Sequence, residues 1–263
     1  MVQIDKSKCI GCKKCSIDCL ANNIDIVDKK AKIKGDCILC GHCVAVCPTS
    51  AVSIPEYDME DVENYQPHSF HLDADRLLHA IKFRRSIRHY KPEPVEADKI
   101  NRIINAGRYT ATAKNNQGCR FVIVQNELDK LKNLVWNNIE SQANQPIREI
   151  PKEFLPFVAF HKRWKANPSD DYLFRNAPAV VYITSDWPLD AGLAAQNMEL
   201  LAVAQGLGVL YNGYLCRVSD QNMELKKWLG IEDTTIRACM LLGYPATTYA
   251  RTAPRKKAQT IIR

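Results

Sequence analysis

Cys9-x2-Cys12-x2-Cys15-x3-Cys19 and Cys37-x2-Cys40-x2-Cys43-x3-Cys47-Pro48 are the stretches that decide how the first part of this chain folds. Each set has the spacing that holds a cubane iron–sulfur cluster, because three thiolates wrap one cluster and the fourth cysteine ligates the other. The sequence therefore predicts one [4Fe–4S] cluster on Cys9, Cys12, Cys15 and Cys47 and a second on Cys37, Cys40, Cys43 and Cys19. The spacing occurs twice, at a separation that suits an internal repeat.

Two other uses of these cysteines fit less well. Zinc sites usually take two well-separated Cys-x2-Cys pairs, and a third cysteine inside each set departs from that pattern. Disulfides need an oxidising compartment, and nothing in the sequence indicates export. Residues 1–55 resemble a bacterial two-cluster ferredoxin, with Leu20 where that family often has proline. We therefore expect this segment to carry single electrons at low potential, for chemistry that belongs to the rest of the chain.

Length and composition indicate a globular protein with one small and one ordinary domain. The chain has 263 residues, of which 46% are apolar and 25% are charged. We assign residues 1–55 to the iron–sulfur domain, the acidic stretch 56–72 to a linker and residues 73–263 to a second domain. No run of about 18 apolar residues and no signal-peptide pattern is present, so we expect no membrane span and a reducing, cytoplasmic setting. The net charge of +7 is dispersed, which argues against nucleic acid as a partner.

The second domain alternates helices with a few widely spaced strands. Hydrophobic periodicity predicts helices over residues 73–85, 96–106, 129–140 and 188–205, and buried strands over 121–124, 179–184 and 239–243. We also expect Ser219 to cap a helix that ends at Leu229. The segment 141–177 is rich in prolines and aromatic residues, which we interpret as short helices and loops of a lid or dimer arm with exposed rings.

A basic motif that suits a phosphate is followed by three other short motifs. Arg84-Arg85-Ser86-Ile87-Arg88 offers paired guanidinium donors for phosphate oxygens, although alone it could be a solvated basic helix end. The others are Thr112-Ala113-Lys114-Asn115-Asn116-Gln117, Gly206-Leu207-Gly208 followed by Gly213, and Gly243-Tyr244-Pro245 followed by Arg255-Lys256. In this order they are similar to the motifs of the FMN-dependent nitroreductase family, from about residue 73 to the end of the chain.

The resemblance implies a fold, a cofactor and roles for these residues. It implies an α+β domain with a central, mostly antiparallel sheet flanked by helices, in a homodimer with FMN at the interface. Arg84, Arg85, Ser86 and Arg88 would hold the phosphate and ribityl chain, Asn115 and Gln117 would hydrogen-bond the flavin, Gly213 would approach its N5, and Arg255 and Lys256 would reach the phosphate. No residue emerges as a catalytic acid, base or nucleophile.

The two parts together predict an iron–sulfur flavoprotein oxidoreductase. Flavin adapts one-electron carriers to two-electron chemistry, so electrons from a ferredoxin-type or NAD(P)H donor would pass to a small organic acceptor such as a nitroaromatic, quinone or activated alkene. The alternative is an electron-carrier or redox-sensing module without its own substrate turnover. Retention of the flavin-contact residue types favours the enzyme.

Overall fold

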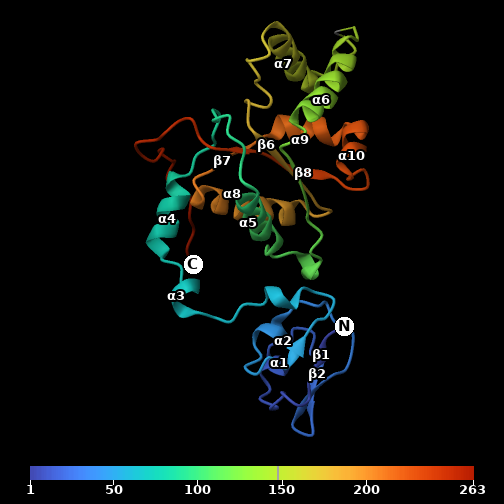
Figure 1. The fold of residues 1–263 in the computed structure, drawn as a ribbon, viewed down its shortest axis with the longest axis vertical. Helices are drawn as coiled ribbons and strands as arrows, with labels where there is room; N and C mark the ends of the chain where they lie inside the picture. Colours follow the sequence, from blue (N-terminus) through green and yellow to red (C-terminus); the bar gives the residue numbers. More distant parts are fainter. Residues whose placement is uncertain (147) are drawn as a thin grey trace. The chain divides into compact units, whose positions relative to one another are not determined.

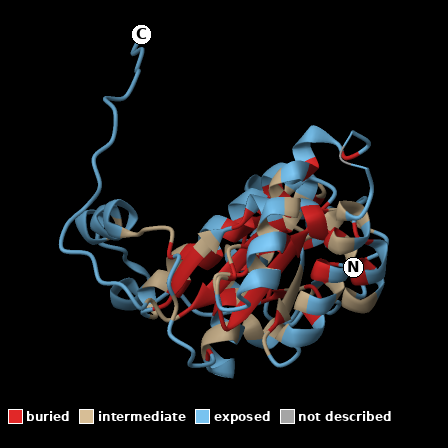
Figure 2. Cartoon of the chain, turned by 90° about the horizontal axis from the view of Figure 1, so that it is seen from above, coloured by how far each residue is buried: buried red, intermediate tan, exposed pale blue. Residues whose placement is uncertain are grey.

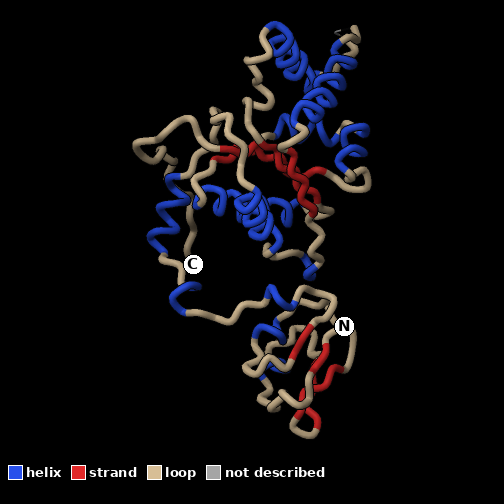
Figure 3. The backbone as a smooth tube through the Cα atoms, viewed as in Figure 1, coloured by secondary structure: helices blue, strands red, loops and turns tan. Residues whose placement is uncertain are grey.

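The structure is a computed structural model that describes residues 1–146 and 148–263, and its contacts divide the chain into two compact units (Figures 1 and 3). The first contains Met1–Leu72 and Thr112–Asn116, so the acidic stretch 56–72 groups with the cysteine-rich segment. The second contains Asp73–Ala111 and Gln117–Arg263. Among the described residues, no helix has the length and apolar character needed to cross a bilayer.

The first unit is built from two copies of a strand–helix–strand repeat. The first copy is β1 (Gln3–Ile4), α1 (Lys14–Ile17) and β2 (Ile24–Val27), and the second is β3 (Lys30–Ile33), α2 (His42–Ala45) and β4 (Val52–Ser53). The strands pair across the copies: β1 lies antiparallel to β4, and β2 lies antiparallel to β3. Each copy therefore completes the sheets of the other. A short 3-10 helix, η1 (Met59–Asp61), and α3 (Pro67–Phe70) follow.

The backbone of the two cysteine loops repeats as closely as their cysteines do. Left-handed φ angles occur in pairs 28 positions apart, as Cys9 is from Cys37: Gly11 with Leu39, Lys13 with Gly41, and Asn22 with Ser50. Gly11 is also needed for space, because a Cβ there would lie 2.2 Å from the carbonyl oxygen of Lys29. Val2, Ile24, Ala31, Val52 and Ile54 form a small apolar core with which Cys9, Cys15, Cys19, Cys43 and Cys47 pack.

The second unit is organised around the predicted central sheet, which is antiparallel throughout. Its strands are β5 (Arg120–Val124), β6 (Ala179–Thr184), β7 (Gly208–Tyr211) and β8 (Ile236–Gly243), in the order β5-β6-β8-β7. The strand β6 is buried along its whole length, which explains its unbroken apolar run. Helices therefore have to cover both faces of the sheet.

Alternate residues of β6 enter two separate cores. Val180 and Tyr182 pack with α6 (Leu128–Ala143), α7 (Leu155–Ala166), α9 (Gly213–Asp220) and α10 (Met223–Leu229), whereas Val181 and Ile183 pack with α5 (Ala97–Arg108) and α8 (Pro188–Ala204). Figure 1 shows these two layers of helices, and Figure 2 shows buried residues concentrated where they meet the sheet. The helix α4 (Ala74–Phe83) contacts α8 and is capped by Asp73, whose Oδ1 accepts from the Arg76 amide at 2.7 Å.

Two details differ from the sequence-based expectations. The aromatic residues of segment 141–177 are largely internal: Phe154 and Phe157 are buried, and Trp164 stacks on the buried Trp136 at 5.0 Å. Ile147 lies outside the described residues. Ser219 lies inside α9 rather than capping a helix; Asn212 caps α9, and Asn222 caps α10 (Met223–Leu229). An asparagine side chain at the start of each of these two helices accepts the capping hydrogen bond that we had expected a serine hydroxyl to accept.

Candidate cofactor sites

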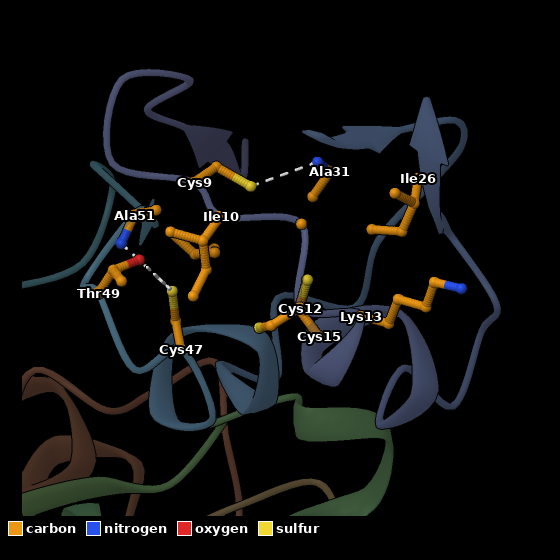
Figure 4. Close-up of a pocket in the computed structure, with 12 residues that line it drawn as sticks. Cys9, Ile10, Cys12, Lys13, Cys15, Ile26, Ala31, Cys47, Thr49 and Ala51 are labelled. Carbon is orange, nitrogen blue, oxygen red and sulfur yellow. Dashed lines mark hydrogen bonds between the residues drawn. The ribbon is translucent and has the colours of Figure 1, made fainter. Parts of the chain in front are cut away.

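Four cysteines from both repeats surround one small cavity in the first unit. The cavity is lined by Cys9, Cys12, Cys15 and Cys47, together with Gly11, Ala31, Thr49 and a few apolar side chains. Figure 4 shows the four sulfurs facing the same space. These are the four ligands that the crossed spacing rule predicted for one cluster, with Cys47 supplied by the second repeat.

The pKa shifts of the thiols also indicate that the cysteines of each set lie close together. Burial raises the pKa of Cys15, and the neighbouring Cys12 and Cys47 raise it further. Burial raises the pKa of Cys43 to about 11, with further contributions from Cys37 and Cys40. Thiolates this close repel one another, and iron would offset the repulsion by binding them. Each group of thiols therefore suits a positively charged iron core.

Backbone amides already point at several of these sulfurs. The amide of Ala31 donates to Cys9 Sγ at 3.4 Å, and the amide of Ala51 donates to Cys47 Sγ at 3.2 Å. In the second set, the amides of Asn23 and Leu39 donate to Cys19 Sγ and Cys37 Sγ, both at 3.3 Å. Such donors stabilise thiolates and tune the potentials of clusters bound to them. Within residues 1–146 and 148–263, no three Cys, His, Asp or Glu side chains come close enough to hold a single metal ion.

The basic motif of the second unit lies where α4 ends and the chain runs beside β7. The amide of Ile87 donates to the carbonyl of Val209 at 3.0 Å, and Ser86 forms a bridge with the same strand. Arg85 donates through Nη1 to the carbonyls of Lys82 and Arg84, at 2.9 and 2.5 Å. Its Nη2 is buried and has no hydrogen-bond partner among the described residues. An unpaired buried guanidinium nitrogen fits an anionic ligand such as a phosphate, since leaving it unpaired is costly.

Arg84, by contrast, already has a protein partner. Its Nη1 lies 3.1 Å from Oε1 of Glu199 on α8, and the two side chains are 25% and 1% exposed. Gln196 and Tyr211 also hydrogen-bond this carboxyl. Burial raises the pKa of Glu199, although the charge and hydrogen bond of Arg84 lower it in part. Arg84 is therefore held between α4 and α8 by a buried ion pair.

No role was predicted for Glu199 or Tyr211. The available signal was an acidic residue within a largely apolar helix, where a buried carboxylate needs a cationic partner. Gly213 begins α9 directly after β7, and a Cβ built there would meet nothing within 4 Å. The open space beside its backbone is compatible with the close flavin approach that we expect. Asn212 before it is fixed by a hydrogen bond to the carbonyl of Leu173 at 2.6 Å.

The predicted flavin contacts Asn115 and Gln117 are assigned to different units. Asn115 groups with the first unit, where its Nδ2 donates to the carbonyls of Ile38 and Leu39 at 3.2 and 3.0 Å. Gln117 belongs to the second unit, and both residues have left-handed φ angles, 55° for Asn115 and 49° for Gln117. Such strain in non-glycine residues is often retained at functional loops.

Three predicted phosphate contacts lie on exposed parts of the chain. Arg88 donates to the carbonyl of Ser86 at 3.5 Å, and Arg255 donates to the carbonyl of Pro254 at 3.4 Å. Lys256 follows in a tail without secondary structure, which is exposed throughout (Figure 2). The structure therefore places Ser86 beside β7 and Gly213 directly after it, and it leaves Arg88, Arg255 and Lys256 exposed.

Comparison with known proteins matches both units to families. The nitroreductase family model matches residues 81–244, and a 4Fe-4S dicluster domain model matches residues 8–51. A protein of Methanothermobacter thermautotrophicus, named as a candidate NADH dehydrogenase/NAD(P)H nitroreductase, is 25% identical over 65% of this chain and 78% of its own length. The NADPH-flavin oxidoreductase of Vibrio harveyi is 28% identical over 72% of this chain and 73% of its own. A nitroreductase with bound FMN from Bacteroides fragilis shares the fold, with a TM-score of 0.58 at 23% identity, over 71% of this chain and 98% of its own.

Proposed function

Because this chain belongs to the nitroreductase family and carries a 4Fe-4S dicluster domain at its N-terminal end, we propose that it passes electrons through two [4Fe–4S] clusters to FMN and on to an organic acceptor. The acceptor would be a nitroaromatic, a quinone or an activated alkene. The observation that carries the proposal is the cavity that gathers Cys9, Cys12, Cys15 and Cys47 from both repeats of the first unit. A fused one-electron domain is useful to a flavin domain because flavin, when bound, adapts one-electron to two-electron chemistry.

The residues of this chain would bind and orient these groups. The eight cysteines of the two repeats hold the irons, and the amides of Ala31, Ala51, Asn23 and Leu39 stabilise their thiolates. Arg85 offers its unpaired Nη2 to the FMN phosphate, and Glu199 fixes Arg84 at the start of the same loop. Gly213 leaves room beside its backbone for the flavin ring. Protons for the acceptor come from water or the flavin, since the sequence pointed to no protein acid or base.

The donor in this proposal is a ferredoxin-type protein or NAD(P)H. The relative from Vibrio harveyi is named for NADPH, which supports the nicotinamide route. The dicluster domain supports a low-potential protein donor, because its cysteines would provide one-electron carriers on the same chain. The route from a protein donor would need the cysteines that hold the clusters, whereas direct reduction of FMN by NAD(P)H would not.

The proposal includes a homodimer with FMN at the interface. On α4, Leu78, Ile81 and Phe83 are 45–50% exposed, and on α8, Leu189 and Leu193 are 71% and 42% exposed. Apolar side chains gathered on helices in this way are typical of subunit interfaces. The mass of the flavin-loaded protein in solution tests this, and a monomer that retains FMN would contradict it.

Cofactor content and reduction provide the main test. Protein purified without oxygen should contain about eight irons per chain and one FMN. Reduced ferredoxin and NAD(P)H are then offered separately, and the acceptors are added in turn to the reduced protein. Oxidation of the flavin by at least one acceptor, with turnover, supports the enzyme. Reduction without turnover of any acceptor would favour the electron-carrier alternative, and zinc in place of iron would reject the clusters.

A further inference from the structure

Thr49 lies beside one cysteine of the cavity in the first unit. Its Oγ1 is 3.7 Å from Cys47 Sγ, and both residues line the space shared with Cys9, Cys12 and Cys15 (Figure 4). A cysteine that ligates iron is a thiolate and has no proton to give. In the loaded protein, the hydroxyl of Thr49 is therefore the donor and the sulfur of Cys47 is the acceptor.

The internal repeat shows that this hydroxyl has no counterpart in the other set. Cys19 occupies the position equivalent to Cys47, and the backbone donors to the two sulfurs correspond: the amide of Asn23 lies 3.3 Å from Cys19 Sγ, and the amide of Ala51 lies 3.2 Å from Cys47 Sγ. The position equivalent to Thr49 is Ala21, which has no side-chain donor. The backbone bonds thus follow the repeat, and the hydroxyl bond breaks its symmetry.

The same contrast holds when the other ligands are included. The set with Cys47 receives the hydroxyl of Thr49 in addition to backbone amides such as those of Ala31 and Ala51. In the set with Cys19, the donors include the backbone amides of Asn23 and Leu39. Adding one electron makes a cluster more negative by one charge, and a hydrogen bond to a ligating sulfur stabilises that added charge. Hydrogen bonds to the sulfurs are among the features that set cluster potentials.

We propose that Thr49 raises the reduction potential of the cluster held by Cys9, Cys12, Cys15 and Cys47 above that of the other cluster. This inference rests on the proposed presence of both clusters. An electron entering the first unit then settles preferentially at the set with Cys47. Electron transfer between the two clusters of the first unit would then be favoured in one direction. The cluster held by Cys37, Cys40, Cys43 and Cys19 would have the lower reduction potential.

Three variants test the proposal by anaerobic redox titration with electron paramagnetic resonance. Thr49→Val keeps the branched shape and removes the hydroxyl. The higher of the two reduction potentials should therefore fall while the lower one stays constant. Thr49→Ser keeps the hydroxyl and should retain the wild-type separation. Ala21→Thr places a hydroxyl at the equivalent position in the first repeat, and it should raise the other potential and narrow the gap.

Iron and sulfide analysis of each preparation separates the possible failures. If the wild-type chain contains no cubane clusters, the proposed cofactors are wrong and this inference falls with them. If both clusters are present, unchanged potentials in Thr49→Val overturn the role of Thr49 and leave the proposed function standing. If Thr49→Val fails to assemble a cluster, Ala21→Thr provides the deciding test. If this variant contains both clusters and the difference between their reduction potentials is unchanged from wild type, the inference is wrong.

Discussion

Replacing Arg84 by alanine should destabilise the second unit before any effect on flavin is considered. The substitution removes the cation 3.1 Å from the Glu199 carboxylate, which is only 1% exposed, and leaves that charge buried. Breaking a buried ion pair by removing one partner typically costs about 3–5 kcal/mol. Arg84 itself keeps 25% exposure, so water can partly replace it, and we take the lower end, about 3 kcal/mol.

The pH dependence of this loss follows from the pKa of Glu199, which burial raises above its ordinary value. Without Arg84, that pKa should rise further, because the arginine's charge and hydrogen bond lower it. A carboxyl with a raised pKa binds protons more tightly in the folded state than in the unfolded state. Stability therefore falls as the pH rises from the unfolded to the folded pKa of Glu199. The defect of Arg84→Ala should be largest near neutral pH and shrink toward pH 5.

Thermal unfolding followed by tryptophan fluorescence measures this effect in the second unit alone, because Trp136, Trp164, Trp187 and Trp228 all belong to it. A loss of about 3 kcal/mol corresponds to a fall of roughly 6–12 °C in Tm for a domain of this size. Arg84→Ala combined with Glu199→Gln should recover most of the loss, because the buried charge is also gone.

The exposed pair Arg120–Asp233 provides the matched control. Its side chains are 54% and 59% exposed, so Arg120→Ala should destabilise the second unit much less than Arg84→Ala does. If Arg84→Ala is no more destabilising than this control, or if its defect is the same at pH 5 and pH 8, the buried-pair argument is wrong.

Three further predictions concern the cofactors. Arg85→Ala should weaken FMN binding about 10- to 100-fold, the value of one charge-assisted hydrogen bond, without changing iron content; equilibrium titration with FMN measures it. Cys19→Ser and Cys47→Ser should each damage one cluster and slow turnover with reduced ferredoxin, while turnover with a chemical reductant acting directly on FMN is spared; if both rates are unchanged from wild type after confirmed cluster loss, internal transfer is refuted. Gly11→Ala should impair cluster assembly because its Cβ would lie 2.2 Å from a backbone carbonyl oxygen, whereas Gly41→Ala, with nothing within 4 Å, should retain more iron.

The fold and the grouping of the cysteines were predictable because their signals are local and repeated. The cysteine spacing constrains which sulfurs can meet, and the structure brings Cys47 to Cys9, Cys12 and Cys15 as the crossed pattern requires. Strand β6 was evident from six consecutive apolar or β-branched positions, because a central strand is buried on both faces. The flavin contacts of Asn115, Gln117, Arg255 and Lys256 stay predictions.

The features that could not be predicted depend on contacts between residues far apart in the sequence. The aromatic side chains of 141–177 were predicted to be exposed because prolines interrupt the segment, yet Phe157 and Trp164 join Trp136 in one core. The spacing of apolar residues within 141–177 does not indicate that Trp136 is their partner. Glu199 was equally hidden, because a helix that is apolar nearly all round gives no indication of which face meets an arginine 115 positions away.

The arginine motif shows why a motif match and a role for each residue are different claims. Arg84 and Arg85 are neighbours of the same type, so sequence alone assigns both to the phosphate. In the structure, Arg84 neutralises Glu199, while Arg85 keeps one buried nitrogen without a partner among the described residues. A guanidinium that already satisfies a buried carboxylate has less to offer a phosphate than one with an unpaired donor. Arg85 is therefore the better candidate for the phosphate contact, and Arg84 for fixing the loop that presents it.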